Sequence, residues 1–279
     1  MSFLVDQYGQ GVHEDVPASD YYRKTLGECN KSGLDIVSRS LYHYKAWLTQ
    51  EEGESTKALN FGRALHCAVL EPELFKQHWV ILPDFGAMQS SINRAKFKRW
   101  KEERADKEFI TESEADQIIC MQEAVHSHPV ASSYISGGIS EVTAFWRDPE
   151  TGLPCKARMD YWIKEFALGV DLKSCLDASF EVFSKAVHAH RYHVQNAQYC
   201  DGWAQCGEPL KHFVFIAVEK TPPYAVATYV LDAASEARGY ELRKRDMNAL
   251  AKAVETDRWP SYNGDKTAEL RIPAYGHYD

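Results

Sequence analysis

Three consecutive strand-like runs between residues 140 and 175 constrain the fold more than any other feature of this sequence. The first two, SEVTAFWRD and LPCKARMDYWI, have alternating aromatic and β-branched residues and are joined by a Gly-bearing turn, which predicts a β-hairpin. The third, ALGVDLKS, is mostly apolar up to Val170, as expected of a strand that is buried on both faces. The chain is therefore predicted to build a sheet in which neighbouring strands end in charged residues.

Helical patterns precede these strands. Apolar residues recur at three- and four-residue steps in LDIVSRSLYHYKAWL, with Ser32 or Ser38 as its cap. A second helix is predicted over TKALNFGRALHCAVL, which stops before Pro72, and a third over TESEADQIICMQEAVHSH. The first twenty or so residues are expected to be irregular, and residues 85–107 are expected to form a loop that leads into a helix.

A long helix over residues 179–205, two strands (HFVFIAVEK and YAVATYVL) and a helix from about Ala233 complete the pattern. This order predicts an α/β fold with a central mixed sheet of about five strands flanked by helices. No repeat or linker divides the chain. We therefore expect one domain over residues 1–279, with a mostly helical part at 1–130 and the sheet at 140–257.

Composition narrows the functional classes. The seven cysteines include no Cys-x-x-Cys pair, which favours reduced thiols in the cytoplasm and argues against zinc or iron–sulfur sites. Neither an export signal nor an apolar run of membrane-spanning length is present. The formal charge of −8 argues against a nucleic-acid partner unless the basic residues are clustered. Residues 91–107 carry seven basic and three acidic side chains, so one face of the protein is expected to be basic.

Two carboxylates and a lysine are predicted to meet in the sheet. Asp171 and Lys173 point the same way along their strand, and Asp160 ends the neighbouring run. Two ionised carboxylates repel each other unless a cation lies between them, and magnesium or manganese prefers such oxygen ligands. Lys173 would then orient or activate a water molecule for attack on phosphorus. The alternative is a solvated strand end with a surface ion pair that contributes little.

The order Asp160 and then Asp171-Leu172-Lys173 resembles the PD-(D/E)xK nuclease signature, with Met159 in place of the usual proline. Four further stretches resemble the RecE (exonuclease VIII) type of phage and prophage recombination exonuclease. They are KSGLDIVSRSLYHY, FGRALHCAVLEPELF, VQNAQYCDGW and FVFIAVEKTPPYAVATYVLD. The resemblance extends over nearly all of the chain.

This resemblance implies roles for several residues. His66 would join Asp160, Asp171 and the backbone carbonyl of Leu172 in holding Mg2+, for which Mn2+ can substitute, with two ions per site. The others in the implied site are Lys173, Glu141, Gln195 and Tyr199. Gln195 and Tyr199 fit a Gln-x-x-x-Tyr motif on one helix face, where they would hold Lys173 or a phosphate. Alternatively, Tyr199 simply packs in the core. Glu141 would help to hold metal-bound water.

DNA contacts are assigned from charge. A 5′ phosphate needs arginine and hydroxyl donors, and the candidates are Ser38, Arg39, Ser40 and Arg63. The basic segment would contact the duplex backbone through Arg94, Lys96, Lys98 and Arg99, although such runs are often only solvated helix faces. Phe97 and Trp100 are candidates to wedge the DNA strands apart; alternatively, Trp100 is a packing residue.

The activity implied by the resemblance is metal-dependent, ATP-independent 5′-to-3′ digestion of linear double-stranded DNA, which leaves 3′ single-stranded tails for recombination. Such enzymes form rings of three or four subunits around DNA ends and pass the tail to a RecT-like annealing protein, in the cytoplasm of a bacterium or phage-infected host. Two alternatives remain open. One is a RecB- or Cas-type nuclease that acts on single strands or cuts internally, and the other is a non-catalytic DNA-end-binding phage protein, which would be expected to lack Asp160, Asp171 or Lys173.

Overall fold

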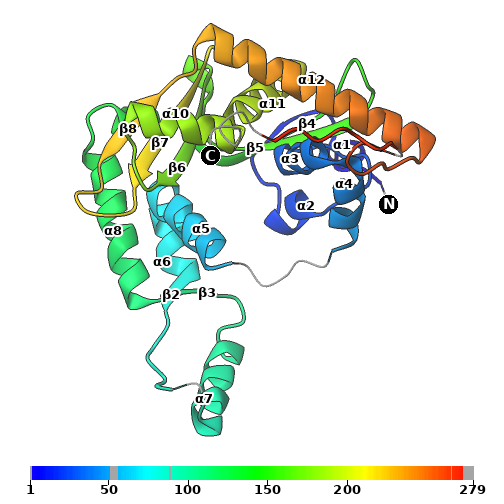
Figure 1. The fold of residues 1–279 in the computed structure, drawn as a ribbon. Helices are drawn as coiled ribbons and strands as arrows, with labels where there is room; N and C mark the ends of the chain where they lie inside the picture. The colour runs from blue at the N-terminus through cyan, green and yellow to red at the C-terminus, as the bar shows by residue number, and fades with distance from the viewer. Residues whose placement is uncertain (1, 51–55, 88, 265, 273–279) are drawn as a thin grey trace.

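The computed structural model describes residues 2–50, 56–87, 89–264 and 266–272. Its centre is a six-stranded sheet in the order β1-β4-β5-β6-β7-β8, in which β6 and β7 are parallel and the other neighbours are antiparallel (Figure 1). The predicted mixed α/β sheet is therefore confirmed. The strands are β1 (Gly11–His13), β4 (Ile139–Arg147), β5 (Pro154–Ile163), β6 (Leu168–Cys175), β7 (His212–Glu219) and β8 (Val226–Tyr229).

Helices cover both faces of this sheet. One apolar core joins it to α3 (Lys31–Arg39), α4 (Leu41–Thr49), α11 (Tyr192–Gln205) and α12 (Ala233–Thr256). The other joins it to α5 (Lys57–Leu70) and α8 (Glu112–Ser127). The first core buries Trp146, Trp203 and Phe215, and the second buries Leu65 and Ile118, so that the central strands are covered on both sides. None of the helices in the described part of the chain is long and apolar enough to span a membrane.

Several predicted elements are confirmed with their boundaries. Thr56 caps α5, which ends before Pro72, and Thr111 forms a capping box with Glu114 at the start of α8. In the β4–β5 turn the Asp148 carboxylate accepts a hydrogen bond from the Thr151 amide at 2.9 Å. This side chain holds the tight connection that the hairpin pattern requires.

Two helices that the sequence predicted to be continuous are interrupted. Ser40 has extended backbone angles and caps α4 through His43, so residues 34–48 belong to α3 and α4 and not to one helix. Residues 179–205 form α10 (Phe180–Ala189) and α11, separated by Arg191 in the left-handed region at φ 56°. The Arg191 guanidinium is paired with Asp246 of α12, which holds this break from a distant part of the chain.

The opening segment, predicted to be irregular, is ordered. It contains α1 (Leu4–Tyr8), β1 and α2 (Ala18–Tyr22), and β1 pairs with β4 at the edge of the sheet. A nearly fully buried ion pair of 2.8 Å between Glu28 and Lys156 of β5 attaches the segment. The prediction failed because three short elements gain their stability from the sheet and not from their own sequence.

The predicted loop and helix of residues 85–107 form an arm. The helix α7 (Ser91–Glu102) lies away from the sheet, beyond the two-stranded parallel pair β2 (Trp79–Ile81) and β3 (Glu108–Ile110) (Figure 1). Phe97 and Trp100 pack against Phe85, and Trp100 also packs against Phe109. These aromatic residues therefore hold the arm together, as the packing alternative predicted for Trp100. The remaining helices are α6 (Pro72–His78) and α9 (Ala131–Tyr134).

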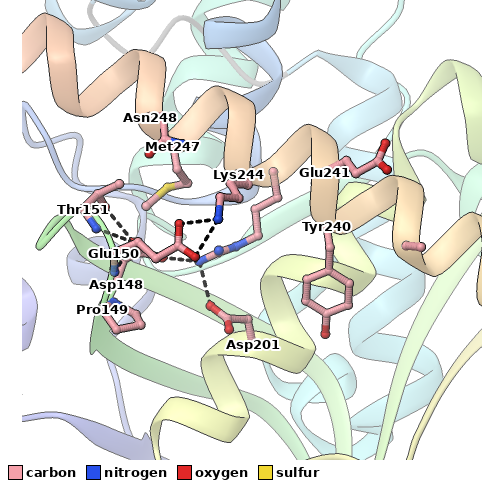
Figure 2. Close-up of a pocket in the computed structure, with 12 residues that line it drawn as sticks. Asp148, Pro149, Glu150, Thr151, Asp201, Tyr240, Glu241, Lys244, Met247 and Asn248 are labelled. Carbon is pink, nitrogen blue, oxygen red and sulfur yellow. Dashed lines mark hydrogen bonds and ion pairs between the residues drawn. The ribbon is translucent and has the colours of Figure 1, made fainter.

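A cavity of 420 Å³ lies between the β4–β5 turn, α11 and α12 (Figure 2). Arg243 of α12 is buried there and pairs with Asp148 at 3.1 Å and Asp201 at 2.8 Å, while its Nε donates to Gln198. Lys244 pairs with Glu150 at the open edge. This cluster fastens the end of the hairpin to α12.

Replacing Arg243 with Met should lower the free energy of unfolding by about 3–5 kcal/mol, because the buried Asp148 and the partly buried Asp201 lose their shared cation. Chemical denaturation would measure the loss. The adjacent Lys244→Met is the matched control, since both partners of the Lys244–Glu150 pair are more than half exposed, and it should cost less than about 1 kcal/mol. Equal losses for the two variants would contradict a structural role for the buried cluster.

Candidate active site

Three carboxylates occupy neighbouring positions across β4, β5 and β6. The antiparallel register of β4 and β5 continues on both sides of Glu141 and Asp160, so these two residues stand opposite each other. The pairing of β5 with β6 stops one residue before Asp160 and Asp171, which take the next opposing positions. A row of acids therefore crosses the three central strands, as the spacing of Asp160 and Asp171 predicted.

The strands are distorted at this row. Glu141 has φ 52°, an unusual backbone conformation for a residue with a side chain. On β4, Ile139 and Val142 contact the same core, although residues three apart face opposite sides in a regular strand. On β5, Met159 and Trp162 do the same. The alternation thus shifts in both strands where the carboxylates lie, and such local strain is characteristic of functional sites.

His66 on α5 completes a compact donor group with the two opposed acids. Its Nδ1 lies 3.3 Å from Oδ2 of Asp160. One nitrogen or oxygen atom from each of His66, Glu141 and Asp160 lies within 4.8 Å of the other two. An imidazole and two carboxylates form a donor set suited to manganese or magnesium. The residues present therefore fit a divalent cation.

The electrostatics of this group also favour a cation. Burial raises the pKa of Asp160 to about 6; the Asp171 charge acts in the same direction, while His66 opposes it. Desolvation in the cleft raises the pKa of Glu141 to about 7, and the charge of Asp160 adds to this effect. Crowded carboxylates resist ionisation, and a bound cation would relieve that repulsion. The backbone amide of Leu172 donates to Asp160 at 2.8 Å and fixes its position.

Asp171 and Lys173 form a second, adjoining unit. Asp171 is 1% exposed, and its Oδ2 lies 2.5 Å from the Lys173 ammonium. The Gln195 amide of α11 donates to the other carboxylate oxygen. Gln195 was expected to hold Lys173 or a phosphate, whereas here it fixes Asp171. In the described residues the compact donor group does not include Asp171, so its role as a metal ligand stays a prediction.

Lys173 is held as a cation. Burial lowers its pKa, but the negative charges of Asp171 and Asp160 outweigh burial, so that its pKa is raised. The ammonium also lies 4.7 Å from the centre of the Tyr192 ring, a cation–π contact. The ion pair is largely buried, with a lysine side chain that is 18% exposed, so it is not the solvated surface pair of the alternative interpretation. Tyr199, one turn beyond Gln195, is buried against Trp203 and Phe213 and lines the edge of the site.

A cleft of 710 Å³ opens above the donor group, between α2 on one side and α5 on the other. His66, Glu141, Asp160 and Tyr199 all line it. Arg63, one turn before His66, also lines the cleft, and its guanidinium pairs with Glu108 at 2.7 Å. Arg63 is therefore placed where a phosphate near the donor group could be contacted.

Other predicted DNA-binding residues lie elsewhere. Ser38, Arg39 and Ser40 form the α3–α4 corner and are not among the described residues that line the cleft. At this corner Ser40 caps α4, and Arg39 donates a hydrogen bond to the Tyr262 hydroxyl. Arg94, Lys96, Lys98 and Arg99 belong to the α7 arm and are also absent from the described lining. Lys98 and Arg99 have acidic partners four residues on, as in a solvated helix face.

Sequence reasoning missed Arg158 and Tyr192. Arg158 of β5 is buried, donates to Thr143 at 2.8 Å and to the Val16 carbonyl at 2.7 Å, and approaches Glu141 at 4.0 Å. It is a fixed cation beside the acids. A signal was available, because Arg158 lies two residues before Asp160 and so on the same face of the strand. Tyr192 lies within the long helix predicted over 179–205, and only the break at Arg191 sets its contact with Lys173.

Comparison with known proteins gives a family and a fold. A family model described as "PDDEXK-like domain of unknown function (DUF3799)" matches residues 31–270. The structure resembles a solved structure described as "Putative exonuclease" from Eubacterium rectale, with a TM-score of 0.61 and 15% sequence identity over 94% of this chain and 98% of that chain. A phage related exonuclease from Haemophilus somnus 129PT aligns with a TM-score of 0.36 and 10% identity over 83% of this chain and 96% of that chain. No curated protein matches the sequence.

Proposed function

Because the chain belongs to the family described as PDDEXK-like domain of unknown function, we propose that it is a divalent-metal-dependent nuclease that hydrolyses phosphodiester bonds in DNA. One observation carries the proposal. The compact group of His66, Glu141 and Asp160 adjoins the buried Asp171–Lys173 pair at the edge of a cleft. A metal bound by these ligands would supply Lewis-acid catalysis for phosphodiester hydrolysis, and the fixed ammonium would add positive charge beside it.

The cation, Mg2+ or Mn2+, would be held by His66, Glu141 and Asp160. Asp171 and the backbone carbonyl of Leu172 are proposed as further ligands, which would provide for two ions. When bound, such a cation stabilises negative charge on a phosphate and makes a coordinated water molecule more acidic.

The remaining residues of the site act through position and charge. Gln195 and the Lys173 ammonium fix the Asp171 carboxylate from two sides. Lys173, held as an ammonium, is thereby oriented to position the attacking water by hydrogen bonding and to offset charge that develops on the phosphate. Arg158 offsets part of the charge of Glu141, and Arg63 is proposed to contact the phosphate of the chain end.

The finer proposal is a 5′-to-3′ exonuclease that works on linear double-stranded DNA without ATP and leaves 3′ tails. It rests on the RecE-like stretches at 61–75 and 194–203, which carry His66 and Gln195. We extend it to a ring of three or four subunits and a RecT-like annealing partner. A ring would reconcile the charge of −8 with DNA binding, because only the channel has to be positive.

The test compares linear and covalently closed circular duplexes. We expect magnesium-dependent release of acid-soluble nucleotides from linear DNA, release of a 5′-terminal label before internal label, and no attack on the circle. Cleavage of the circle would favour internal cutting, and activity limited to single strands would favour a RecB-type enzyme. If no DNA were cleaved with either metal, the nuclease proposal would fall. The non-catalytic alternative is disfavoured because Asp160, Asp171 and Lys173 are all present.

A further inference from the structure

One wall of the cleft comes from outside the region that matches the family. The match begins at residue 31, whereas Ala18, Tyr21 and Tyr22 of α2 line the cleft opposite α5. Residues 2–30 therefore add a surface to the candidate active site that the matched region does not supply. Such a surface is a natural place for substrate selection.

This wall is fixed to the strands that carry the acids. β1 pairs with β4, and the buried Glu28–Lys156 pair joins the segment to β5. Arg158, which approaches Glu141, also donates to Val16 and lies over the Tyr21 ring at 4.5 Å from its centre. The position of α2 relative to the donor group is thus set by buried polar contacts.

The two tyrosines of α2 have different surroundings. Tyr21 is 8% exposed, and the Arg158 guanidinium covers its ring. Tyr22 is 52% exposed, and its ring packs edge to face with that of Tyr21, with 5.2 Å between the ring centres. Desolvation and the charge of Glu141 raise the pKa of the Tyr22 phenol, whereas Arg158 and Arg63 act to lower it. The open ring of Tyr22 lines the same cleft as Glu141, Asp160 and Arg63.

The opposite wall leaves room for a flat group. Gly62 of α5 lines the cleft, and a Cβ atom built at this position would meet no atom within 4 Å. Leu59, one turn earlier, also lines the cleft and is 59% exposed. Tyr22 on α2 and Leu59 on α5, both exposed, thus line the cleft beside the acids, and we call the open part of the cleft at Gly62 the slot. A nucleotide combines the matching features, because its phosphate is anionic and its base is flat and apolar on both faces.

We propose that Tyr22 is the stacking platform for the base of the nucleotide whose phosphate occupies the metal-binding group, with Leu59 bordering the other side of the slot. This inference rests on the proposed nuclease function. Stacking on an aromatic ring accepts every base, so the platform would add affinity without sequence preference. It would do so by holding the terminal nucleotide out of the duplex stack.

The test compares Tyr22→Ala with Tyr22→Phe in the full-length protein, with Tyr42→Ala, an exposed tyrosine outside the described cleft lining, as control. We expect Tyr22→Ala to raise KM for linear DNA about 5- to 100-fold, the range for loss of one stacked base, with kcat little changed. Tyr22→Phe keeps the ring and should restore the wild-type KM. Equal loss in the Phe variant, or an unchanged KM in the Ala variant, would overturn the stacking role.

A second readout does not depend on cleavage. In the Lys173→Met background with magnesium, a duplex that carries 2-aminopurine as an unpaired 5′-terminal nucleotide should lose fluorescence on binding, through stacking on Tyr22. Adding Tyr22→Ala should remove this quenching, and adding Tyr22→Phe should preserve it. If the wild-type protein cleaves DNA but the quenching is independent of Tyr22, only this inference fails. If the wild-type protein cleaves nothing while Tyr22-dependent quenching persists, the nuclease proposal fails and the base site stands.

Discussion

Lys173→Met should reduce the rate of DNA cleavage by about 10²- to 10⁴-fold, the usual contribution of a positioned acid–base or charge-stabilising group. The substitution removes the ammonium that pairs with Asp171 and lies over the Tyr192 ring, and it keeps an unbranched side chain of similar length. Gln195 still donates to the Asp171 carboxylate, which offsets part of the loss of its buried cation. Single-turnover cleavage of end-labelled DNA would measure the loss, with thermal melting as the check on folding.

The control for this variant is Lys164→Met. Lys164 also forms a close pair with a carboxylate, Glu208 at 2.6 Å, but at an exposed position outside the cleft. It should cleave DNA at the wild-type rate. If Lys173→Met retained full activity, Lys173 would have no part in the chemistry, and the assignment of the site would have to be abandoned.

The strands and the hairpin could be predicted because their signals are local. Alternating residues, a Gly-bearing turn and an apolar run define β4, β5 and β6 without reference to the rest of the chain. The helix break at Arg191 and the strand β1 could not be predicted in this way. At Arg191 the break is held by Asp246 on α12, and β1 exists as a strand only because β4 offers an edge to it. Both depend on contacts between residues far apart in the sequence.

The candidate site follows the same division. The alternation of side chains along strands was enough to predict that Asp160 and Asp171 lie close together. Helical spacing was enough to predict that Gln195 and Tyr199 share one helix face. What the sequence could not give was the distortion that centres on Glu141 and Asp160. The side-chain alternation shifts in β4 and in β5 at the same level of the sheet. Because the shift depends on how the two strands pair, the residue pattern of one strand does not predict it. That shift accompanies the grouping of two acids with His66.

Asp160→Asn should weaken Mn2+ binding by at least about 10- to 100-fold and abolish metal-dependent cleavage, because it removes a charged ligand at the centre of the donor group. The amide oxygen can still accept the hydrogen bond from the Leu172 amide, so the contact between β5 and β6 is retained. Isothermal titration with Mn2+ would measure the affinity, and EDTA should remove cleavage by the wild-type protein in the same way.

Glu71→Gln separates a specific ligand from general negative charge. Glu71 lines the same cleft and accepts a hydrogen bond from Ser140, but it is not part of the compact group with His66. If the cation is held by specific ligands, Glu71→Gln should bind Mn2+ nearly as tightly as the wild type. Equal weakening by the two variants would mean that the cleft attracts cations only through its total charge. The distorted pairing of Glu141 with Asp160 would then need another explanation, because a strained backbone lowers the stability of the fold and would have no role in binding a ligand.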